Sequence, residues 1–378
     1  IYSKKQFMLL KNLKLMHNFF ILIFYFIIFS VAVSSASDFN YDTGMALKSD
    51  LADKATITSM HVYNDRILAV GVHGIVLISN DMGETWMQAD SVPFLNTLTD
   101  VQCITESQCW AVGHDLTILH SVDGGKNWEV QYNDIDFDAP FLSIHMSDYL
   151  NGIVVGAFGK SMTTKDGGEN WSSSVVTDDP YEPHLNSVYS SNKMKSENGV
   201  NLMFVAGEIG QVHISSDQGK SWSMVDTEYF GSLWGGISVD QNRKLLLGMA
   251  GKILYLRFND ETLNEFSLDT LFAGIKNSLT DIKRLNNGNY IISGNGGVIA
   301  ILDLENETTE TCIRGDRLSN TSVIEISDDK YLLSGEKGFR THSMRDCQSN
   351  FEDKNSISKD MWMKSEFQYE EWVPYDWQ

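Results

Sequence analysis

The sequence is short of basic residues and lacks several common catalytic signatures. It has 378 residues, with 50 Asp and Glu against 29 Lys and Arg, and a formal net charge of −21. Residues 1–36 contain four lysines and no acidic residue, so the remainder is more acidic still. Such a surface argues against nucleic acid and anionic lipid as partners. Neither a Gly-x-Ser-x-Gly motif nor a phosphate-binding loop is present.

Long helical patterns and proline are also scarce. No long amphipathic helical pattern follows residue 40, and the chain has 5 prolines against 29 glycines. It contains 19 Phe, 14 Tyr and 9 Trp, and 42% of its residues are hydrophobic. This composition is typical of a β-rich globular protein with a large core.

Cysteine is rare as well, and its four residues fall into two pairs. Cys103 and Cys109 are close enough in sequence to form a disulfide across a hairpin, and Cys312 and Cys347 could then pair with each other. The alternative is four buried free thiols. None of the four has the spacing of zinc ligands, so we expect no metal site.

Residues 1–36 have the pattern of a secretory signal peptide. Two lysines precede an apolar run at 19–29, and small residues at 34–36 allow cleavage after Ala36. Met16 is a more conventional start than Ile1, so we interpret residues 1–15 as upstream read-through. No cysteine stands at the cleavage point for lipid attachment. We therefore expect an exported protein, periplasmic or secreted. The alternative is an uncleaved membrane anchor, for which the apolar run is short.

A turn motif, Ser/Thr-x-Asp-x-Gly-x-x-Trp, occurs four times, at residues 79–86, 121–128, 164–171 and 215–222. The hydroxyl and carboxylate can accept main-chain N–H bonds within the turn, the glycine permits a positive φ, and the tryptophan covers the sheet. This motif is known as an Asp box, and we interpret it as a structural turn lock. A ligand or calcium loop is the alternative, but the carboxylates of an EF-hand are missing. The residues of the motif are Asp81, Gly83, Trp86, Asp123, Gly125, Trp128, Asp166, Gly168, Trp171, Asp217, Gly219 and Trp222.

A longer repeat predicts the fold. A hydrophobic segment that ends in a glycine turn recurs seven times, with leading glycines at Gly71, Gly113, Gly156, Gly207, Gly248, Gly294 and Gly335. A period of about 40–50 residues with several short strands is the signature of a β-propeller. The sequence thus predicts an all-β fold over residues 37–346: a seven-bladed β-propeller of four-stranded antiparallel blades. The seventh repeat is one strand short, and we expect the N-terminal segment at 38–53 to supply that strand and close the ring.

Residues 347–378 do not repeat and form an acidic, aromatic C-terminal tail. The tail either packs across the propeller or docks a partner.

The inner strands of a propeller line its central channel, and aligning them gives two polar levels. The first level holds Ser59, Asp100, Ser143, Ser187, Trp234, Asp281 and Ser322. The second holds His61, Gln102, His145, Tyr189, Gly236, Lys283 and Ile324. The candidate channel and partner-binding residues are His61, Asp100, Gln102, His145, Tyr189, Trp234, Asp281 and Lys283. The alternative is a water-filled channel of satisfied polar groups. His61 and His145 stand two blades apart without a third metal ligand.

Asp boxes also occur in sialidases, which makes a glycoside hydrolase the alternative function. That chemistry needs paired carboxylates, or a Tyr with an acid partner, and sialidases add an arginine cluster. The aligned inner positions hold no arginine, and Asp100 and Asp281 are expected on opposite sides of the channel. We therefore assign no catalytic residue and no cofactor. A glycan-binding propeller is a further alternative.

The repeat resembles the photosystem II stability/assembly factor-like family of BNR (Asp-box) propellers. The best matches are residues 110–128 and 152–171, and the resemblance extends over about residues 55–345. It implies a seven-bladed propeller that is not an enzyme and that binds a membrane-protein subunit during assembly, which the family does through an arginine-rich patch. We accordingly expect a monomeric accessory or assembly factor whose partner is a protein, either a membrane protein or an envelope complex, and not nucleic acid.

Overall fold

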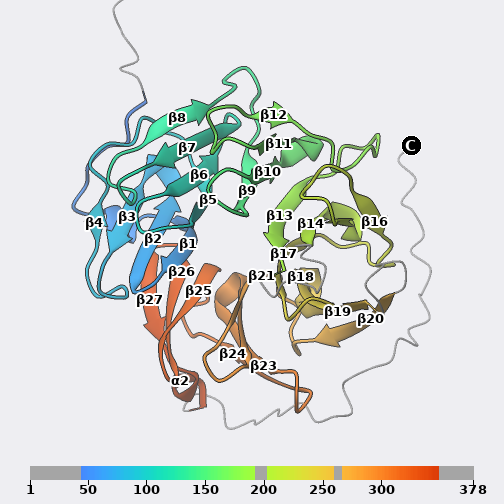
Figure 1. The fold of residues 1–378 in the computed structure, drawn as a ribbon. Coiled ribbons are helices and arrows are strands. Elements are labelled where there is room, and N and C mark those ends of the chain that lie inside the picture. The colour runs from blue at the N-terminus through green and yellow to red at the C-terminus, as the bar shows by residue number, and fades with distance from the viewer. Residues whose placement is uncertain (1–43, 192–201, 259–265, 349–378) are drawn as a thin grey trace, which may run out of the picture. The chain divides into compact units, whose positions relative to one another are not determined.

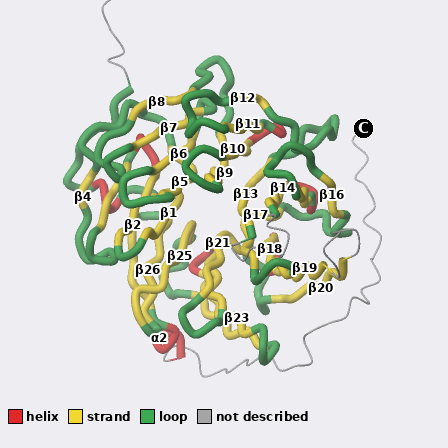
Figure 2. Tube along the Cα trace, viewed as in Figure 1, coloured by secondary structure: helices red, strands yellow, loops and turns green. Residues whose placement is uncertain are grey.

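The computed structural model describes residues 44–191, 202–258 and 266–348. The described residues from Met45 onward belong to one compact unit, and the leader predicted at 1–36 lies outside the described residues. So does nearly all of the predicted tail. The described residues are mostly strands and connecting loops, with only short helical turns (Figure 2). None of their helices has the length and apolar character needed to cross a membrane.

Seven antiparallel sheets follow one another along the chain (Figure 1). The first blade consists of β1 (Ile57–Tyr63), β2 (Arg66–Gly71), β3 (Val76–Ser79) and β4 (Met87–Gln88). The second has β5 (Leu98–Cys103), β6 (Cys109–Gly113), β7 (Thr117–Ser121) and β8 (Glu129–Tyr132). The third has β9 (Phe141–Met146), β10 (Gly152–Gly156), β11 (Ser161–Thr164) and β12 (Ser172–Ser173).

The remaining blades repeat this order. The fourth blade has β13 (Leu185–Ser190), β14 (Met203–Gly207), β15 (Val212–Ser215) and β16 (Ser223–Val225). The fifth has β17 (Leu233–Ser238), β18 (Arg243–Gly248), β19 (Lys252–Phe258) and β20 (Phe266–Phe272). The sixth has β21 (Leu279–Arg284), β22 (Tyr290–Gly294), β23 (Val298–Asp303) and β24 (Thr308–Ile313). The seventh has β25 (Asn320–Ser327), β26 (Lys330–Gly335) and β27 (Gly338–His342), followed by the short helix α2 (Met344–Gln348).

The blades form a closed ring. Each inner strand contacts the inner strand of the next blade, and β25 contacts β1. Figure 1 shows these inner strands gathered around the centre. The predicted seven-bladed propeller with four-stranded antiparallel blades is thereby confirmed.

The seventh blade departs from the prediction at its outer edge. It has three strands among the described residues, and residues 44–53 contribute no strand to it. That segment lies along the first blade instead, where Ala46 N donates to Val92 O at 2.9 Å and Ser49 N donates to the Gln88 side chain at 3.0 Å. Its hydrogen-bonding groups are therefore directed to the edge of β4. The predicted clasp strand is wrong for residues 44–53, and residues 38–43 lie outside the described part.

The N-terminal part of the described chain nevertheless contacts the seventh blade. The 3₁₀ turn η1 (Ala52–Lys54) contacts β27, and Ala52 packs in the same apolar cluster as Phe339. A Cβ on Gly338 would lie 1.9 Å from the Asp53 carbonyl oxygen. The turn and β27 thus approach so closely that only glycine fits at this position.

The core lies between neighbouring blades. Every residue of β6, β10, β14 and β22 is buried, because a middle strand has a blade against each of its faces. Leu68 and Val70 of the first blade, for example, share a cluster with Val101 and Ala111 of the second. This explains why these strands are continuously apolar in the sequence and do not alternate.

The repeated glycine turns are required by close backbone contacts. In the first blade, a Cβ on Gly71 would lie 2.2 Å from Thr56 O, and a Cβ on Gly74 would lie 1.9 Å from Phe94 O. His73 between them has a φ of 58°. Gly74 N also donates to Asn96 O at 2.8 Å, which fixes the turn to the connection leading to the next blade.

The four Asp-box turns share one hydrogen-bond pattern. In the second blade the Ser121 hydroxyl donates to Asp123 Oδ1 at 2.9 Å and accepts from Gly125 N at 2.8 Å. Asp123 Oδ1 also accepts from Asn127 N at 2.9 Å, and Trp128 Nε1 donates to Gly125 O at 2.8 Å. The equivalent bonds to the hydroxyl and carboxylate occur in the other three turns. These carboxylates are occupied within their own turns, which is what a turn lock requires.

Candidate functional site: the inner ring and the apolar face

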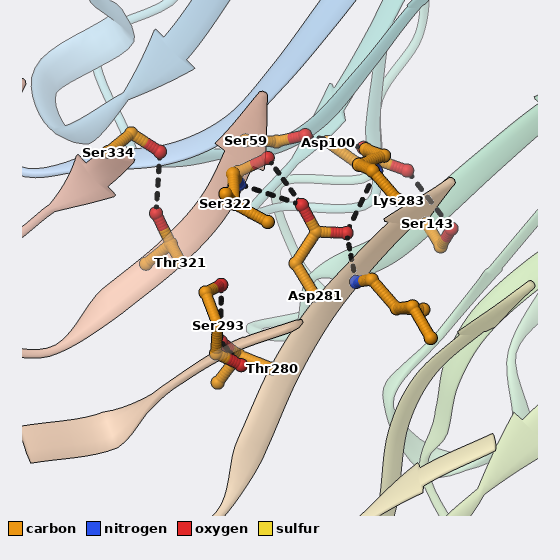
Figure 3. Close-up of polar contacts among 12 residues, drawn as sticks. Ser59, Asp100, Ser143, Thr280, Asp281, Lys283, Ser293, Thr321, Ser322 and Ser334 are labelled. Carbon is orange, nitrogen blue, oxygen red and sulfur yellow. Dashed lines mark hydrogen bonds and ion pairs between the residues drawn. The ribbon is translucent and has the colours of Figure 1, made fainter. Parts of the chain in front are cut away.

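The inner strands bring most of the predicted first-level residues into one ring. Each inner strand has a bulge directly after its first residue, and the residue beyond the bulge belongs to the first level. Figure 3 shows five of them: Ser59, Asp100, Ser143, Asp281 and Ser322.

The fifth blade is out of step with the prediction by one residue. Gly235 pairs with Leu247 as Asp100 pairs with Val112, so the first-level residue is Gly235 and not Trp234. The second-level residue is accordingly Ile237 and not Gly236. Trp234 occupies the bulge itself and is 41% exposed. The sequence alignment failed here because this blade has no polar side chain to mark the register.

Asp100 joins three consecutive blades. Its carboxylate accepts hydrogen bonds from the hydroxyls of Ser59 at 2.8 Å and Ser143 at 3.0 Å. It also accepts from the main-chain nitrogens of Val101 at 2.9 Å and Ile144 at 3.0 Å. Burial raises the pKa of Asp100, although these four bonds favour the charged form.

Asp281 has the corresponding role between the sixth and seventh blades. Its carboxylate accepts from the Ser322 hydroxyl at 2.7 Å and from the nitrogens of Val323 at 3.0 Å and Ile282 at 2.9 Å. Lys283 Nζ lies 2.8 Å from Oδ1 and balances the charge (Figure 3). Both ring carboxylates are thus used to hold neighbouring blades together.

A set of side chains that the sequence analysis missed connects the blades one residue earlier. The Thr58 hydroxyl donates to Leu98 O at 2.6 Å, and the Thr99 hydroxyl donates to Phe141 O at 2.6 Å. The same contact recurs from Thr280 to Asn320 O at 2.9 Å and from Thr321 to Ile57 O at 2.7 Å. The signal was available, because the residue before the first level is threonine in four of the seven repeats.

Most of the second-level residues are neutral polar groups. His61 Nε2 lies 2.9 Å from Cys103 O, and Gln102 Oε1 accepts from Met146 N at 2.5 Å. Burial lowers the pKa of His61 and of His145 to about 4, so both imidazoles are neutral at pH 7. Among the described residues, buried His145 Nε2 and the Tyr189 hydroxyl have no hydrogen-bond partner.

A second feature is a set of exposed hydrophobic side chains at one end of the third to fifth blades. Some occupy the turns between the second and third strands, others the connections between blades, and Trp234 stands at the start of β17. These two kinds of loop lie at the same end of the blades. Two hydrogen bonds between them show this: Gly159 N donates to Pro183 O at 3.1 Å, and Gly210 N donates to Gly231 O at 2.8 Å. The apolar face, as we call it, comprises Ile135, Phe158, Tyr181, Ile209, Phe230, Trp234 and Met249.

The side chains of the apolar face are open to solvent. Tyr181 is 85% exposed and Phe230 is 73% exposed, while Phe158 and Ile209 are about half exposed. Phe158 also lies edge-on to His184, with ring centroids 4.9 Å apart. The Asp boxes lie at the opposite end of the blades, between the third and fourth strands.

The structure brings the four cysteines together as two pairs. Cys103 and Cys109 are directly opposite on β5 and β6, with Cα atoms 4.0 Å apart. Cys312 on β24 and Cys347 on α2 have Cα atoms 5.8 Å apart. In the structure the sulfur atoms of each pair are bonded.

Comparison with known families decides the relationship of this propeller to others. The model of the family described as "Photosynthesis system II assembly factor YCF48" matches residues 87–327. The chain belongs to the YCF48 family. The resemblance inferred from the Asp-box repeats is therefore confirmed.

One curated relative is the "Photosystem II assembly lipoprotein Ycf48" of Synechococcus sp. (strain CC9902). It is 28% identical over 171 residues, which are 44% of this chain and 48% of the relative. The chain thus spans about half the length of the curated relative it matches.

Solved structures show the same fold at low identity. "YCF48 bound to D1 peptide" has a TM-score of 0.60 and 16% identity over 79% of this chain and 98% of that one. "YCF48 from Cyanidioschyzon merolae" has a TM-score of 0.58 and 14% identity over 81% and 99%. The WD40 propeller domain of Doa1 has a TM-score of 0.58 and 14% identity over 79% and 94%. Because a WD40 domain is about as similar as the YCF48 structures, these similarities establish the fold alone.

Proposed function

We propose that this chain is an exported, non-enzymatic assembly or accessory factor that binds a polypeptide segment of a membrane-protein partner on its apolar face. The observation that carries the proposal is the exposure of seven large hydrophobic side chains at one end of three neighbouring blades. Large exposed hydrophobic side chains that gather at one end of a domain are characteristic of a binding site. Membership of the YCF48 family supports a protein as the ligand.

The chemistry of the ring supports binding over catalysis. Glycoside hydrolysis needs one carboxyl group that can donate a proton and a second that can act as nucleophile or base. Asp100 accepts four hydrogen bonds. Asp281 accepts three hydrogen bonds and also forms an ion pair with Lys283. A carboxylate held in this way has its lone pairs occupied and serves to fix the blades.

The form of the apolar face suits an extended peptide. Its side chains project from successive loops, so they offer separate hydrophobic contacts along the rim of three blades. Aromatic side chains are enriched at protein interfaces because they bury a large area with few rotatable bonds. One solved YCF48 is described as bound to a D1 peptide, which supports a peptide as the ligand class.

The leader pattern at residues 1–36 and the relative that is described as a lipoprotein both support export. An exported factor meets membrane proteins at the point where their loops leave the bilayer. The partner we propose is therefore an envelope membrane protein, and the segment bound is one of its exposed loops or termini.

The test is an affinity capture from the organism's own envelope, with the partner identified by mass spectrometry. The double variant Phe158→Ser/Ile209→Ser removes two half-exposed side chains from the apolar face. The control variant Val122→Ser/Met224→Ser removes two exposed side chains from loops and strands away from that face. Exposed substitutions change stability by only about ±0.5 kcal/mol, so all three proteins should remain folded.

We expect one membrane protein to be recovered with the wild type and the control, and at least tenfold less with the face variant. Equal recovery with all three proteins would place the contact elsewhere. Binding to a glycan array that is lost in the face variant, with no protein recovered, would overturn the proposal in favour of a glycan-binding propeller.

A further inference from the structure

Three potential metal ligands converge beside the last blade. Cys312 comes from β24 of the sixth blade, His342 from the end of β27, and Cys347 from α2. His342 Nε2 lies 3.1 Å from Cys347 Sγ and 3.9 Å from Cys312 Sγ. The three ligand atoms lie within 4.8 Å of one another, and of the described residues only these three His, Cys, Asp or Glu side chains form such a group.

The distances from His342 to the two sulfurs are close to those around a small tetrahedral cation, and the sulfurs, which are bonded to each other here, would have to separate on reduction. Zinc binds thiolate sulfur at about 2.3 Å and imidazole nitrogen at about 2.0–2.1 Å, so the tetrahedral ligand atoms stand roughly 3.5–3.8 Å apart. His342 Nε2 is slightly closer than that range to Cys347 Sγ, at 3.1 Å, and slightly farther than it from Cys312 Sγ, at 3.9 Å. Two thiolates and one imidazole are also the ligand types that zinc prefers over calcium or magnesium.

The surroundings leave room for a fourth ligand. A cavity of about 540 Å³ opens on the three residues, and Asp346 also lines it. Arg314 and Arg317 face the same cavity. The Asp316 carboxylate pairs with Arg314 at 2.5 and 2.6 Å and with Arg340 at 3.3 Å. Two thiolates would neutralise a divalent cation, and water would complete the tetrahedron.

We propose that Cys312, His342 and Cys347 form a redox-gated zinc site. In the oxidised protein the two sulfurs form a disulfide, and no cation is bound. A dithiol reductant transfers two electrons to that disulfide, which yields two cysteine thiols and the oxidised reductant. A zinc ion then displaces one proton from each thiol and is held by two thiolates and the imidazole of His342.

The position of the site gives it a mechanical consequence. It fastens α2, which follows the last strand, to the outer strand of the sixth blade. The link therefore lies beside the seventh blade, which has three strands among the described residues. Disulfide and zinc would provide it in oxidising and reducing conditions respectively.

The test uses the full chain and cobalt(II) as a spectroscopic substitute for zinc. The reduced protein should bind one cobalt per chain with a thiolate-to-cobalt charge-transfer band, and zinc should displace it. The oxidised protein should show no band. The variant Cys103→Ser/Cys109→Ser, which removes the other cysteine pair, should behave like the wild type.

Two further variants separate the site from general thiol binding. Cys347→Ser should abolish the charge-transfer spectrum of the tetrahedral site. His342→Ala leaves the disulfide intact, so its fold can be checked by circular dichroism in the oxidised state, and it should weaken cobalt binding by at least about tenfold. No band in the reduced wild type, a band that survives Cys347→Ser, or unchanged affinity in folded His342→Ala would overturn the proposal.

Discussion

The hydroxyl of Thr321 donates a hydrogen bond to the main-chain carbonyl of Ile57, 2.7 Å away. The two residues are 264 positions apart in the chain, and the bond joins the inner strand of the last blade to that of the first. The same side-chain bond links other neighbouring blades through Thr58, Thr99 and Thr280. The ring is thus closed by the same contact that connects blades adjacent in sequence.

Replacing Thr321 with valine tests this closure. Valine has nearly the same shape but cannot donate to Ile57 O, and it also loses the contact of the hydroxyl with the Ser334 hydroxyl at 3.0 Å. We expect Thr321→Val to lower the free energy of unfolding by about 1–2 kcal/mol in urea titrations. The exposed Thr308→Val on β24 is the control and should change it by no more than about 0.5 kcal/mol. Equal effects of the two substitutions would contradict a closing role for Thr321.

The Asp-box carboxylates predict a specific dependence of stability on pH. Burial of Asp217 opposes its ionisation, but hydrogen bonds from Ser221, Ser215 and the main chain outweigh it and lower the pKa to about 2. An unfolded Asp has a pKa of about 3.9. The stabilisation is therefore present above pH 4 and is lost as the pH falls towards 2.

The measurement compares the wild type with Asp217→Asn across that range. The difference in unfolding free energy should be largest at neutral pH and should shrink between pH 4 and pH 2. Asp136→Asn, at an exposed site, controls for the loss of one negative charge. A difference that stays constant down to pH 2 would show that the charged form of Asp217 contributes nothing.

Lys244 predicts a dependence of stability on pH in the alkaline range. It is fully buried, its Nζ donates to the carbonyls of Asp240 at 2.5 Å and Gln241 at 2.8 Å, and it lies 4.7 Å from the Phe204 ring centroid. Burial lowers its pKa to about 7, and Asp240 opposes this only in part. Because an unfolded Lys titrates near 10.4, the unfolded state binds more protons between about pH 7 and 10.

The wild type should therefore gain stability relative to Lys244→Met as the pH rises from 7 to 10. Unfolding titrations at several pH values give this difference directly. Parallel profiles for the two proteins would mean that Lys244 keeps its ordinary pKa in the folded state.

The cysteine pairing is tested by mapping. Peptides from protein purified without reductant should contain the cross-links Cys103–Cys109 and Cys312–Cys347. Reduction before digestion should release all four thiols. Alkylation of all four cysteines in the unreduced, unfolded chain would show that neither disulfide forms.

The sequence predicts the repeats well because each blade needs the same local features. The glycine turns recur because backbone atoms approach too closely for a Cβ, as at Gly71 and Gly74. The Asp boxes recur because each turn satisfies its own polar groups. Such constraints act within one repeat, so they are visible in the spacing of a single sequence.

Features that depend on contacts between repeats were harder to predict. Trp234 was placed one residue out of register, because only the paired strand β18 defines where the bulge lies. The grouping of Cys312 with His342 could not be predicted from the spacing, because 30 residues separate them and only the fold brings them together. The exposure of Phe158 and Ile209 also depends on the fold, because they occupy the middle of their turns with φ values of 54° and 55°.

The central claim is that the apolar face contacts a membrane-protein partner. Site-specific photo-crosslinking in the living cell tests it most directly, with a photoreactive residue at Tyr181 on the apolar face or, as the control, at Val122 in the Asp box of the second blade. The account predicts a crosslink to one membrane protein from Tyr181 and none from Val122. Crosslinks to that protein from Val122 alone, or none from either position, would contradict it.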